Sequence, residues 1–213
     1  KAQSLFISGA EVNSLFDELL ASILDVTGSE YGFIGQVLYR DGKPYLKNFA
    51  TTDISWNDET RRFYETNAPE GLEFTEMQNL FGTVITTGEA VIANDAPNDP
   101  RAGGIPEGHP PLNAFLGLPF FSGQRLIGML ALANRPGGYD QALVDILTPL
   151  LSTCSSIVEA YRVKQGQVRA EGELKGSEER FRQLAENVNA VFWMMSGTLD
   201  KMIYINPAYE RVW

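Results

Sequence analysis

The strongest constraint on the fold is an apolar stripe in the last third of the chain. Its members are separated by four and three residues in turn, the a/d spacing of a coiled coil, and they are Leu143, Leu147, Leu150, Cys154, Ile157 and Tyr161. Ile146, Leu151 and Val158 widen the stripe, so one side of this helix is expected to face its own domain and the other a second chain. The pattern predicts a long helix that forms a homodimer.

Proline and glycine interrupt this helix pattern. Pro149 either kinks the helix or, with Thr148 as its cap, begins a new one. Between residues 164 and 175 the apolar positions disappear, and glycines weaken a stretch that is otherwise helix-prone. Further on, an apolar face resumes, and residues 191–195 and 202–205 predict the two strands of a hairpin that turns at Ser196 and Gly197.

The preceding residues predict helices alternating with antiparallel hairpins. Ser8 and Glu11 match a capping box before an apolar face at helical spacing, which predicts a helix over residues 9–27. Two pairs of aromatic and β-branched stretches, each joined by a turn that contains glycine, predict hairpins. The expected strands are 31–39, 45–52, 91–93, 114–121 and 126–133, and the expected helices lie near 58–66 and over 77–87.

A proline-rich and glycine-rich loop from Asn94 to Pro111 is the first candidate for a site, because long loops in compact domains are usually functional or disordered. An arginine and a histidine over an aromatic pocket would hold an anionic or heterocyclic ligand. Alternatively, the asparagine and aspartate satisfy turn backbone and the arginine is solvated. The residues concerned are Asn94, Asp95, Arg101 and His109.

Four aromatic residues are candidates for the apolar wall of the same pocket, and they are Trp56, Phe74, Phe81 and Phe115. Aromatic side chains at these positions are equally consistent with a filled core. Their positions in the sequence do not distinguish a ligand cavity from a packed interior.

Several stretches resemble the GAF domains of bacterial sensor histidine kinases and related signalling proteins. The stretches read LFGTVITTGEAVIANDAPNDPR, GHPPLNAFLGLPFF and GQRLIGMLALANRPGGYD, with TTDISWND before them, and the resemblance covers roughly residues 5–165. Two later stretches, SEERFRQLAENVNAVFWMM and MIYINPAYERVW, resemble the opening helix and first two strands of a PAS domain.

The resemblance implies an α+β fold with an antiparallel sheet of about six strands and a long C-terminal signalling helix. Helices on one sheet face would form the dimer contact, and the other face would hold a small-molecule pocket. The implied organisation is a GAF domain over 1–160, a helical linker over 161–180 and a truncated PAS start over 181–213. The chain is therefore expected to be part of a longer protein that carries an output domain.

Composition and motifs exclude several functions. A net charge of −10 and a pI near 4.6 disfavour nucleic acid and anionic lipid as partners. The most apolar stretch, Leu126–Ala133, is much shorter than the ~20 residues of a membrane helix, so no membrane span is expected and the cytoplasm is the expected location. No nucleophile elbow, phosphate loop or zinc-ligand spacing is present, which predicts no catalysis and no metal.

The cofactors of related GAF domains also fit poorly. Bilin photoreceptors attach their chromophore to a cysteine, commonly beside a histidine, whereas Gly108 precedes His109 and Cys154 lies in the long helix. Cyclic-nucleotide GAF modules carry an Asn-Lys, then Phe, then Asp-Glu pattern. Asn134, Arg135 and Tyr139 resemble its start, but Leu143 and Val144 stand where the acidic pair should be. Methionine-sulfoxide-reducing GAF enzymes need several cysteines, and this chain has one. The cofactor is left unknown.

The sequence therefore predicts a sensory input module of a multidomain signalling protein, with a two-component sensor histidine kinase as the expected setting. A small ligand would be sensed in the pocket and relayed through the dimeric helix. The alternative is a module without ligand that dimerises and sets the helix register for the output domain.

Overall fold

The computed structural model describes residues 9–52, 72–103, 110–187 and 190–212, and these form two compact units, one ending at Arg162 and the other beginning at Val163. The predicted cap residue Ser8 and the predicted helix near 58–66 lie outside the described residues.

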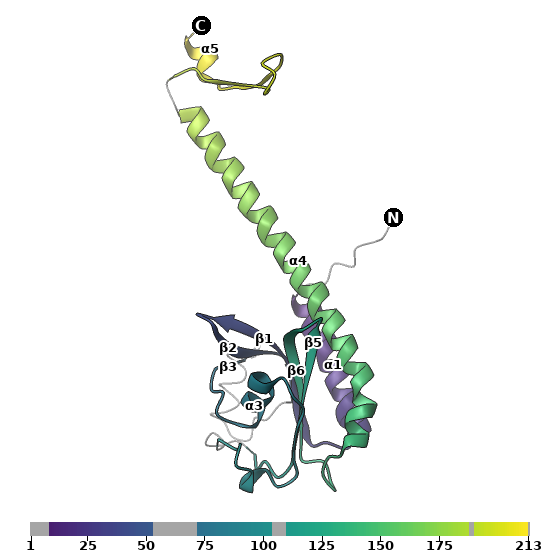
Figure 1. The fold of residues 1–213 in the computed structure, drawn as a ribbon. Coiled ribbons are helices and arrows are strands. Elements are labelled where there is room, and N and C mark those ends of the chain that lie inside the picture. The colour runs from purple at the N-terminus through teal and green to yellow at the C-terminus, as the bar shows by residue number, and fades with distance from the viewer. Residues whose placement is uncertain (1–8, 53–71, 104–109, 188–189, 213) are drawn as a thin grey trace. The chain divides into compact units, whose positions relative to one another are not determined.

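The first unit is built on a six-stranded sheet in which all described strand pairs are antiparallel (Figure 1). The spatial order is β3-β2-β1-β6-β5-β4, so the central pair joins strands far apart in sequence. The strands are β1 Tyr31–Arg40, β2 Lys43–Thr51, β3 Glu73–Phe74, β4 Val91–Ala93, β5 Phe115–Ser122 and β6 Arg125–Ala133. This confirms the predicted α+β fold with six antiparallel strands.

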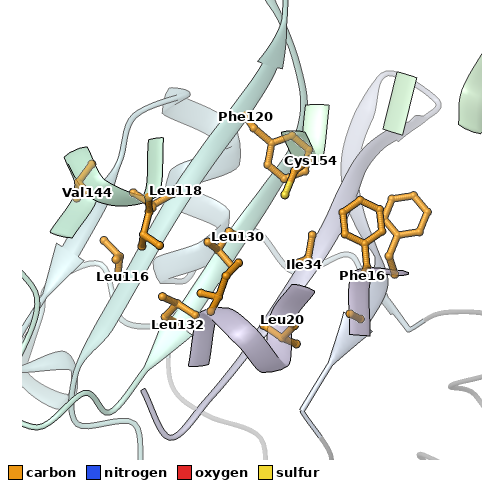
Figure 2. Packing of buried hydrophobic residues seen from close by; sticks show 14 of the residues in the cluster. Phe16, Leu20, Ile34, Leu116, Leu118, Phe120, Leu130, Leu132, Val144 and Cys154 are labelled. Atoms are coloured by element: carbon orange, nitrogen blue, oxygen red, sulfur yellow. The ribbon is translucent and has the colours of Figure 1, made fainter. Parts of the chain in front are cut away.

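Helix α1 (Gly9–Thr27) and the first-unit part of helix α4 (Gln141–Asn187) cover one face of this sheet, as Figure 1 shows. Their apolar side chains join those of the central strands in one buried cluster, part of which is drawn in Figure 2. Phe16 of α1 stacks on Phe49 of β2, and Phe49 also meets the ring of Tyr161 of α4 edge-on. Aromatic packing thus holds this part of α4 against the sheet of its own domain.

The opposite sheet face carries α3 (Leu80–Thr87) and the short 3-10 helix η2 (Ala96–Asn98). Asn79 caps α3, since its side chain accepts a hydrogen bond from the N–H of Gly82 at 2.8 Å. Gly88 ends the helix with a left-handed backbone (φ 71°) that few other residues adopt readily. A second, smaller apolar cluster lies under α3.

Helix α4 includes Pro149 within its bounds, so the alternative of a new helix starting there is not realised. Asp140 caps the start of α4 by accepting a hydrogen bond from the N–H of Leu143. Further along, the Arg162 guanidinium donates to the carbonyls of Val37 (2.8 Å) and Ile127 (3.2 Å), where β1 and β6 no longer pair. Burial lowers the pKa of this arginine from its ordinary value.

The long apolar helix passes a simple test for a membrane span by length and composition. In the first unit, however, Leu147, Cys154 and Val158 of α4 are fully buried against the sheet. One third (33%) of the apolar window is buried in this way, and the core helix of a globular domain passes the same test.

The second unit contains the end of α4, the hairpin β7 (Trp193–Met195) and β8 (Met202–Ile205), and the short helix α5 (Ala208–Val212). The predicted hairpin is confirmed, whereas α5 was not predicted. Buried Asn206 holds this unit together: its Nδ2 donates to the carbonyls of Ala185 and Ala190, and its Oδ1 accepts from the N–H of Phe192.

Candidate ligand-binding cavity

A cavity of about 860 Å³ lies on the α3 face of the sheet in the first unit. The strands β1, β3 and β6 form its floor, while α3 and the segments around η2 and Pro111 form its sides. Apolar side chains dominate the described lining, as is usual for small-molecule sites. The arrangement predicted from the resemblance, with helices on one face and a pocket on the other, matches the geometry of the described residues.

Three phenylalanines form the most organised part of the wall. Phe33 of β1 stacks with Phe74 of β3 at a centroid distance of 6.2 Å, and Phe81 of α3 meets both rings edge-on. All three line the cavity, so this aromatic group offers ring faces and edges to an apolar ligand. Because the rings also contact one another, they fill part of the space themselves.

The described lining contains no lysine, arginine or histidine, and its two carboxylates already have partners. Glu73 pairs with Arg40 at 3.0 Å and lies 4.0 Å from the ammonium of Lys47. Glu76 accepts a hydrogen bond from the N–H of Gln78. The described part of the lining therefore offers no free cation to an anionic ligand.

Tyr31 brings a hydroxyl to the rim, where it donates to the carbonyl of Pro111 at 3.0 Å. Burial, followed by the nearby charge of Glu30, raises the pKa of this phenol to about 12. The hydroxyl therefore stays protonated over the physiological range and acts as a neutral hydrogen-bonding group.

The structure separates the predicted site residues into those at the cavity and those elsewhere. Phe74, Phe81 and Phe115 line it. Trp56 and His109 lie outside the described residues.

Three polar candidates from the loop are absent from the cavity lining, and their hydrogen bonds give the physical reason. Asn94 clamps the backbone of Tyr139: Nδ2 donates to its carbonyl at 2.9 Å and Oδ1 accepts from its N–H at 2.7 Å. Asp95 accepts two hydrogen bonds from the side chain of Asn98. Arg101 forms a bidentate pair with Asp99 and donates to the carbonyl of Ile92 at 3.1 Å.

Hydrogen bonds connect the cavity rim to the start of α4. Asn113 lines the cavity, and its N–H donates to Oδ1 of Asn134 at 2.8 Å. Asn134 also donates to the carbonyl of Pro111 and to the carboxylate of Glu30, and its backbone is left-handed (φ 59°). This residue holds the rim against the end of β6.

The next residues continue the connection into the helices. Arg135 donates to the carbonyl of Thr27, the last residue of α1, at 2.9 Å, and to the carbonyl of Gly138 at 2.6 Å. The hydroxyl of Tyr139 lies 3.0 Å from that of Ser29 and accepts from the N–H of Arg135. Together Asn134, Arg135 and Tyr139 form what we call the rim-to-helix cluster.

Sequence reasoning missed Phe33, Tyr31 and the rim-to-helix cluster as site residues. Phe33 carried a usable signal, because it lies in a predicted strand two residues after Tyr31 and so shares its face. The cluster carried a signal as well, since Asn134, Arg135 and Tyr139 resemble the start of the cyclic-nucleotide pattern, but that pattern was set aside because its acidic pair is replaced by Leu143 and Val144. Among the described residues, no group of three or more His, Cys, Asp or Glu is placed to hold a metal ion.

Comparison with known proteins now decides the family, because the model of the GAF domain matches residues 9–159. This chain belongs to the GAF domain family. It is 22% identical over 182 residues to the methyl sulfide methyltransferase-associated sensor of Methanosarcina acetivorans. That alignment covers 84% of this chain but only 17% of the sensor, so the chain spans a small part of its relative.

Solved structures share the GAF fold with this chain at low identity. The GAF domain of an Acinetobacter phosphoenolpyruvate-protein phosphotransferase superimposes with a TM-score of 0.54 at 18% identity, over 72% of this chain and 86% of that chain. The free methionine-R-sulfoxide reductase of Neisseria meningitidis, solved with its substrate, gives 0.52 at 13% identity, over 72% and 87%. At this level of identity the likeness shows the fold alone.

Proposed function

We propose that this chain is the sensory input part of a signalling protein, in which a small ligand in the cavity changes how the start of α4 is held. The observation that carries the proposal is the rim-to-helix cluster, because it bonds the cavity rim to the end of α1 and to the residues that precede α4. The printed name of the Methanosarcina relative, a sensor, supports the same class of function.

A relay of this kind requires only a modest difference in binding. A ligand shifts a two-state equilibrium by its differential affinity for the two states, and a few kcal/mol are enough to reset an output. A bound ligand would displace the rim residues Pro111 and Asn113. Because both are hydrogen-bonded to Asn134, their displacement would also move the adjacent Arg135 and, through its hydrogen bond, Tyr139.

Dimerisation through α1 and α4 remains part of the proposal, with a corrected set of residues. Leu143, Leu147 and Cys154 are buried inside their own unit, so these three belong to the core and not to a contact between chains. Leu150, Ile157 and Tyr161 are only partly buried, and Ile146 on the same flank is 63% exposed. This flank of α4 is the surface that we assign to a second copy.

Residues 181–213 fit the start of a PAS domain, and a two-component sensor histidine kinase in the cytoplasm remains the setting that we propose. The sequence resemblance carries this assignment. Support comes from the hairpin of the second unit, whose residues Trp193, Met202 and Ile203 are all more than half exposed. Apolar strands of this kind normally pack against further strands or helices.

We further propose that the chain has no catalytic activity of its own. In the reductase mechanism considered above, cysteines exchange disulfides, whereas burial raises the pKa of the Cys154 thiol to about 11. A buried, protonated thiol is a poor nucleophile.

The alternative of a spacer without ligand is favoured by the mutual contacts of Phe33, Phe74 and Phe81, which already occupy part of the wall.

Native mass spectrometry of the protein as purified, compared with its denatured mass, tests these proposals together. A dimer that carries a non-covalent adduct, lost on denaturation, is the expected result and gives the mass of the ligand. A dimer without adduct, and with no mass gained across a metabolite panel, would favour the spacer. A monomer without adduct would contradict both.

A further inference from the structure

The buried side chain of Asn48 on β2 has a property that the proposed function does not explain. The residue is 5% exposed, and neither Nδ2 nor Oδ1 of its carboxamide has a hydrogen-bond partner among the residues that the structure describes. Buried amides without partners are rare in folded proteins because desolvation costs free energy that no hydrogen bond returns. A water molecule or a ligand is the kind of partner that satisfies such a group.

The strand register places this amide on the cavity side of the sheet. Asn48 is two residues from Leu46, which belongs to the apolar cluster under α3, and side chains two apart on a strand share a face. Across the strand pair, Asn48 faces Gly35 of β1. The face opposite, under α1 and α4, is therefore not where this carboxamide points.

Two aromatic residues of the cavity wall lie close to this position in the strand register. Phe33 lies two residues before Gly35 on β1, and Phe74 of β3 pairs with Leu46. Both rings line the cavity, and they stack on each other at 6.2 Å. Asn48 is itself outside the described lining, one register step from these rings, so a ligand in the cavity reaches the carboxamide only when the Phe33–Phe74 pair moves aside.

Glycine at position 35 provides the space that the amide occupies. A Cβ atom on Gly35 would lie 2.8 Å from Oδ1 of Asn48 and 2.9 Å from a methyl carbon of Leu46. Real Cβ atoms essentially never approach other atoms this closely. A larger residue at position 35 would displace the amide, so the glycine and the asparagine act as a pair.

We propose that the Asn48 carboxamide is the polar anchor of the cavity ligand, and that this ligand is a neutral molecule with an apolar body and an adjacent hydrogen-bond donor and acceptor. This rests on the proposed sensory function. One donor and one acceptor side by side on Asn48 are complementary to a primary or cyclic amide. The aromatic rings accept the apolar body, and the described lining offers no cation for an anion.

Three probes of one shape test the ligand class on the whole chain, namely benzamide, benzoate and toluene. Titrations followed by NMR chemical shifts of the lining residues Phe81 and Ala131 compare the wild type with Asn48→Leu. The matched control is Asn98→Leu, which alters an exposed asparagine that bonds only to Asp95 in the described structure. The wild type and the control are expected to bind benzamide about tenfold more tightly than toluene or benzoate, the effect of one good hydrogen bond.

In Asn48→Leu, the advantage of benzamide over toluene should disappear while toluene still binds. Benzamide bound to the wild-type protein should also shift the NMR signal of the Asn48 side-chain amide. This measurement needs no variant and stays informative if Asn48→Leu does not fold. Equal affinity for benzamide and toluene, tighter binding of benzoate, or an unmoved Asn48 signal would overturn the ligand class and leave the sensory proposal intact. If none of the probes binds at millimolar concentration, both this proposal and the cavity's role as a ligand site are wrong.

Discussion

At the scale of single residues, Asn94 shows how a polar loop side chain serves the fold. Both of its hydrogen bonds go to the backbone of Tyr139, next to the cap of α4. Replacement by alanine removes both, and at about 0.5–1.5 kcal/mol for each bond we expect a loss of about 2 kcal/mol in the free energy of unfolding. Urea denaturation at neutral pH measures this loss.

Asn98→Ala is the matched control for this variant, because the side chain of Asn98 is exposed and bonds to Asp95. Its free energy of unfolding should change by less than about 0.5 kcal/mol. A stability of Asn94→Ala equal to that of the control would contradict the role of the clamp.

Cys154 gives the domain a pH dependence in the alkaline range. Burial raises the pKa of its thiol from 9.0 to about 11, so between these values the unfolded chain has lost a proton that the folded chain keeps. The contribution of this group is fully present below pH 9 and is lost as the pH rises toward 11. In Cys154→Ala the free energy of unfolding should fall less steeply over this range.

The comparison requires urea titrations at several pH values for both proteins. Tyr31 is present in both proteins, and its pKa is raised to about 12. Its titration therefore lowers the free energy of unfolding of both proteins from nearer pH 10 upward. Identical slopes from pH 9 to 11 in the two proteins would mean that the thiol is not buried as described.

At the scale of elements, the sequence predicted most of the fold because hydrophobic periodicity marks where a strand or helix buries a face. It predicted the helix over residues 9–27 with the observed bounds, and its helix over 77–87 begins later, at Leu80, because Asn79 adopts an extended backbone and caps it. The central pairing of β1 with β6, from Tyr31 opposite Ala133 to Gln36 opposite Gly128, has no local signal in the sequence and was not predicted.

The candidate site was less predictable, because burial and cavity formation depend on contacts between distant segments. The loop composition suggested that Asn94 and Arg101 bind a ligand. In the structure Asn94 instead bonds to the backbone of Tyr139, and Arg101 bonds within its own segment of chain. An a/d spacing likewise marks an apolar face without saying what covers it, which is why Leu147 and Cys154 proved to be core. Asn48 shares a strand face with Leu46 in a predicted strand, and a polar residue at such a position is an irregularity that periodicity alone does not interpret.

Residues 163–176 of α4, in the second unit, form a stretch of helix in which no side chain is buried, so its stability depends on intrinsic propensity. Gly166 and Gly172 are exposed, and a Cβ atom added to either would meet nothing within 4 Å. Alanine at both positions should therefore stabilise the helix by about 1 kcal/mol per site. Amide hydrogen exchange over residues 163–176 should slow accordingly.

Ala170→Gly is the matched opposite change, at an exposed position of the same segment, and should speed exchange there. Unchanged exchange in both variants would mean that this segment is not helical in solution.

At the scale of the whole molecule, the proposed dimer depends on the exposed flank of α4. Ile146→Asp places a charge on that flank at a side chain that is 63% exposed, so folding should be little affected while association is lost. Light scattering at tens of micromolar should report a dimer for the wild type and a monomer for the variant. Ser152→Asp, exposed on another side of the same helix, should remain dimeric. A dimer that survives Ile146→Asp would place the interface elsewhere.

Signalling through this domain further requires that the cavity and the start of α4 respond to each other, which is the central claim of the account. The chain of contacts runs from Asn113 at the rim through Asn134 and Arg135 to Tyr139. Proximity of this kind is not coupling, and a measured change at one end caused by occupancy at the other is needed.

The most direct test is amide hydrogen exchange over residues 139–150 with and without saturating toluene, a probe that apolar cavities accept. Chemical shifts of Phe81 and Ala131, both in the cavity lining, establish that toluene is bound. The account predicts that occupancy alters exchange at the start of α4, and that Asn134→Ala, which removes the hydrogen bonds to Asn113 and Pro111, abolishes the change. Exchange that stays the same while the cavity is occupied would contradict the claim that this domain relays ligand binding through α4.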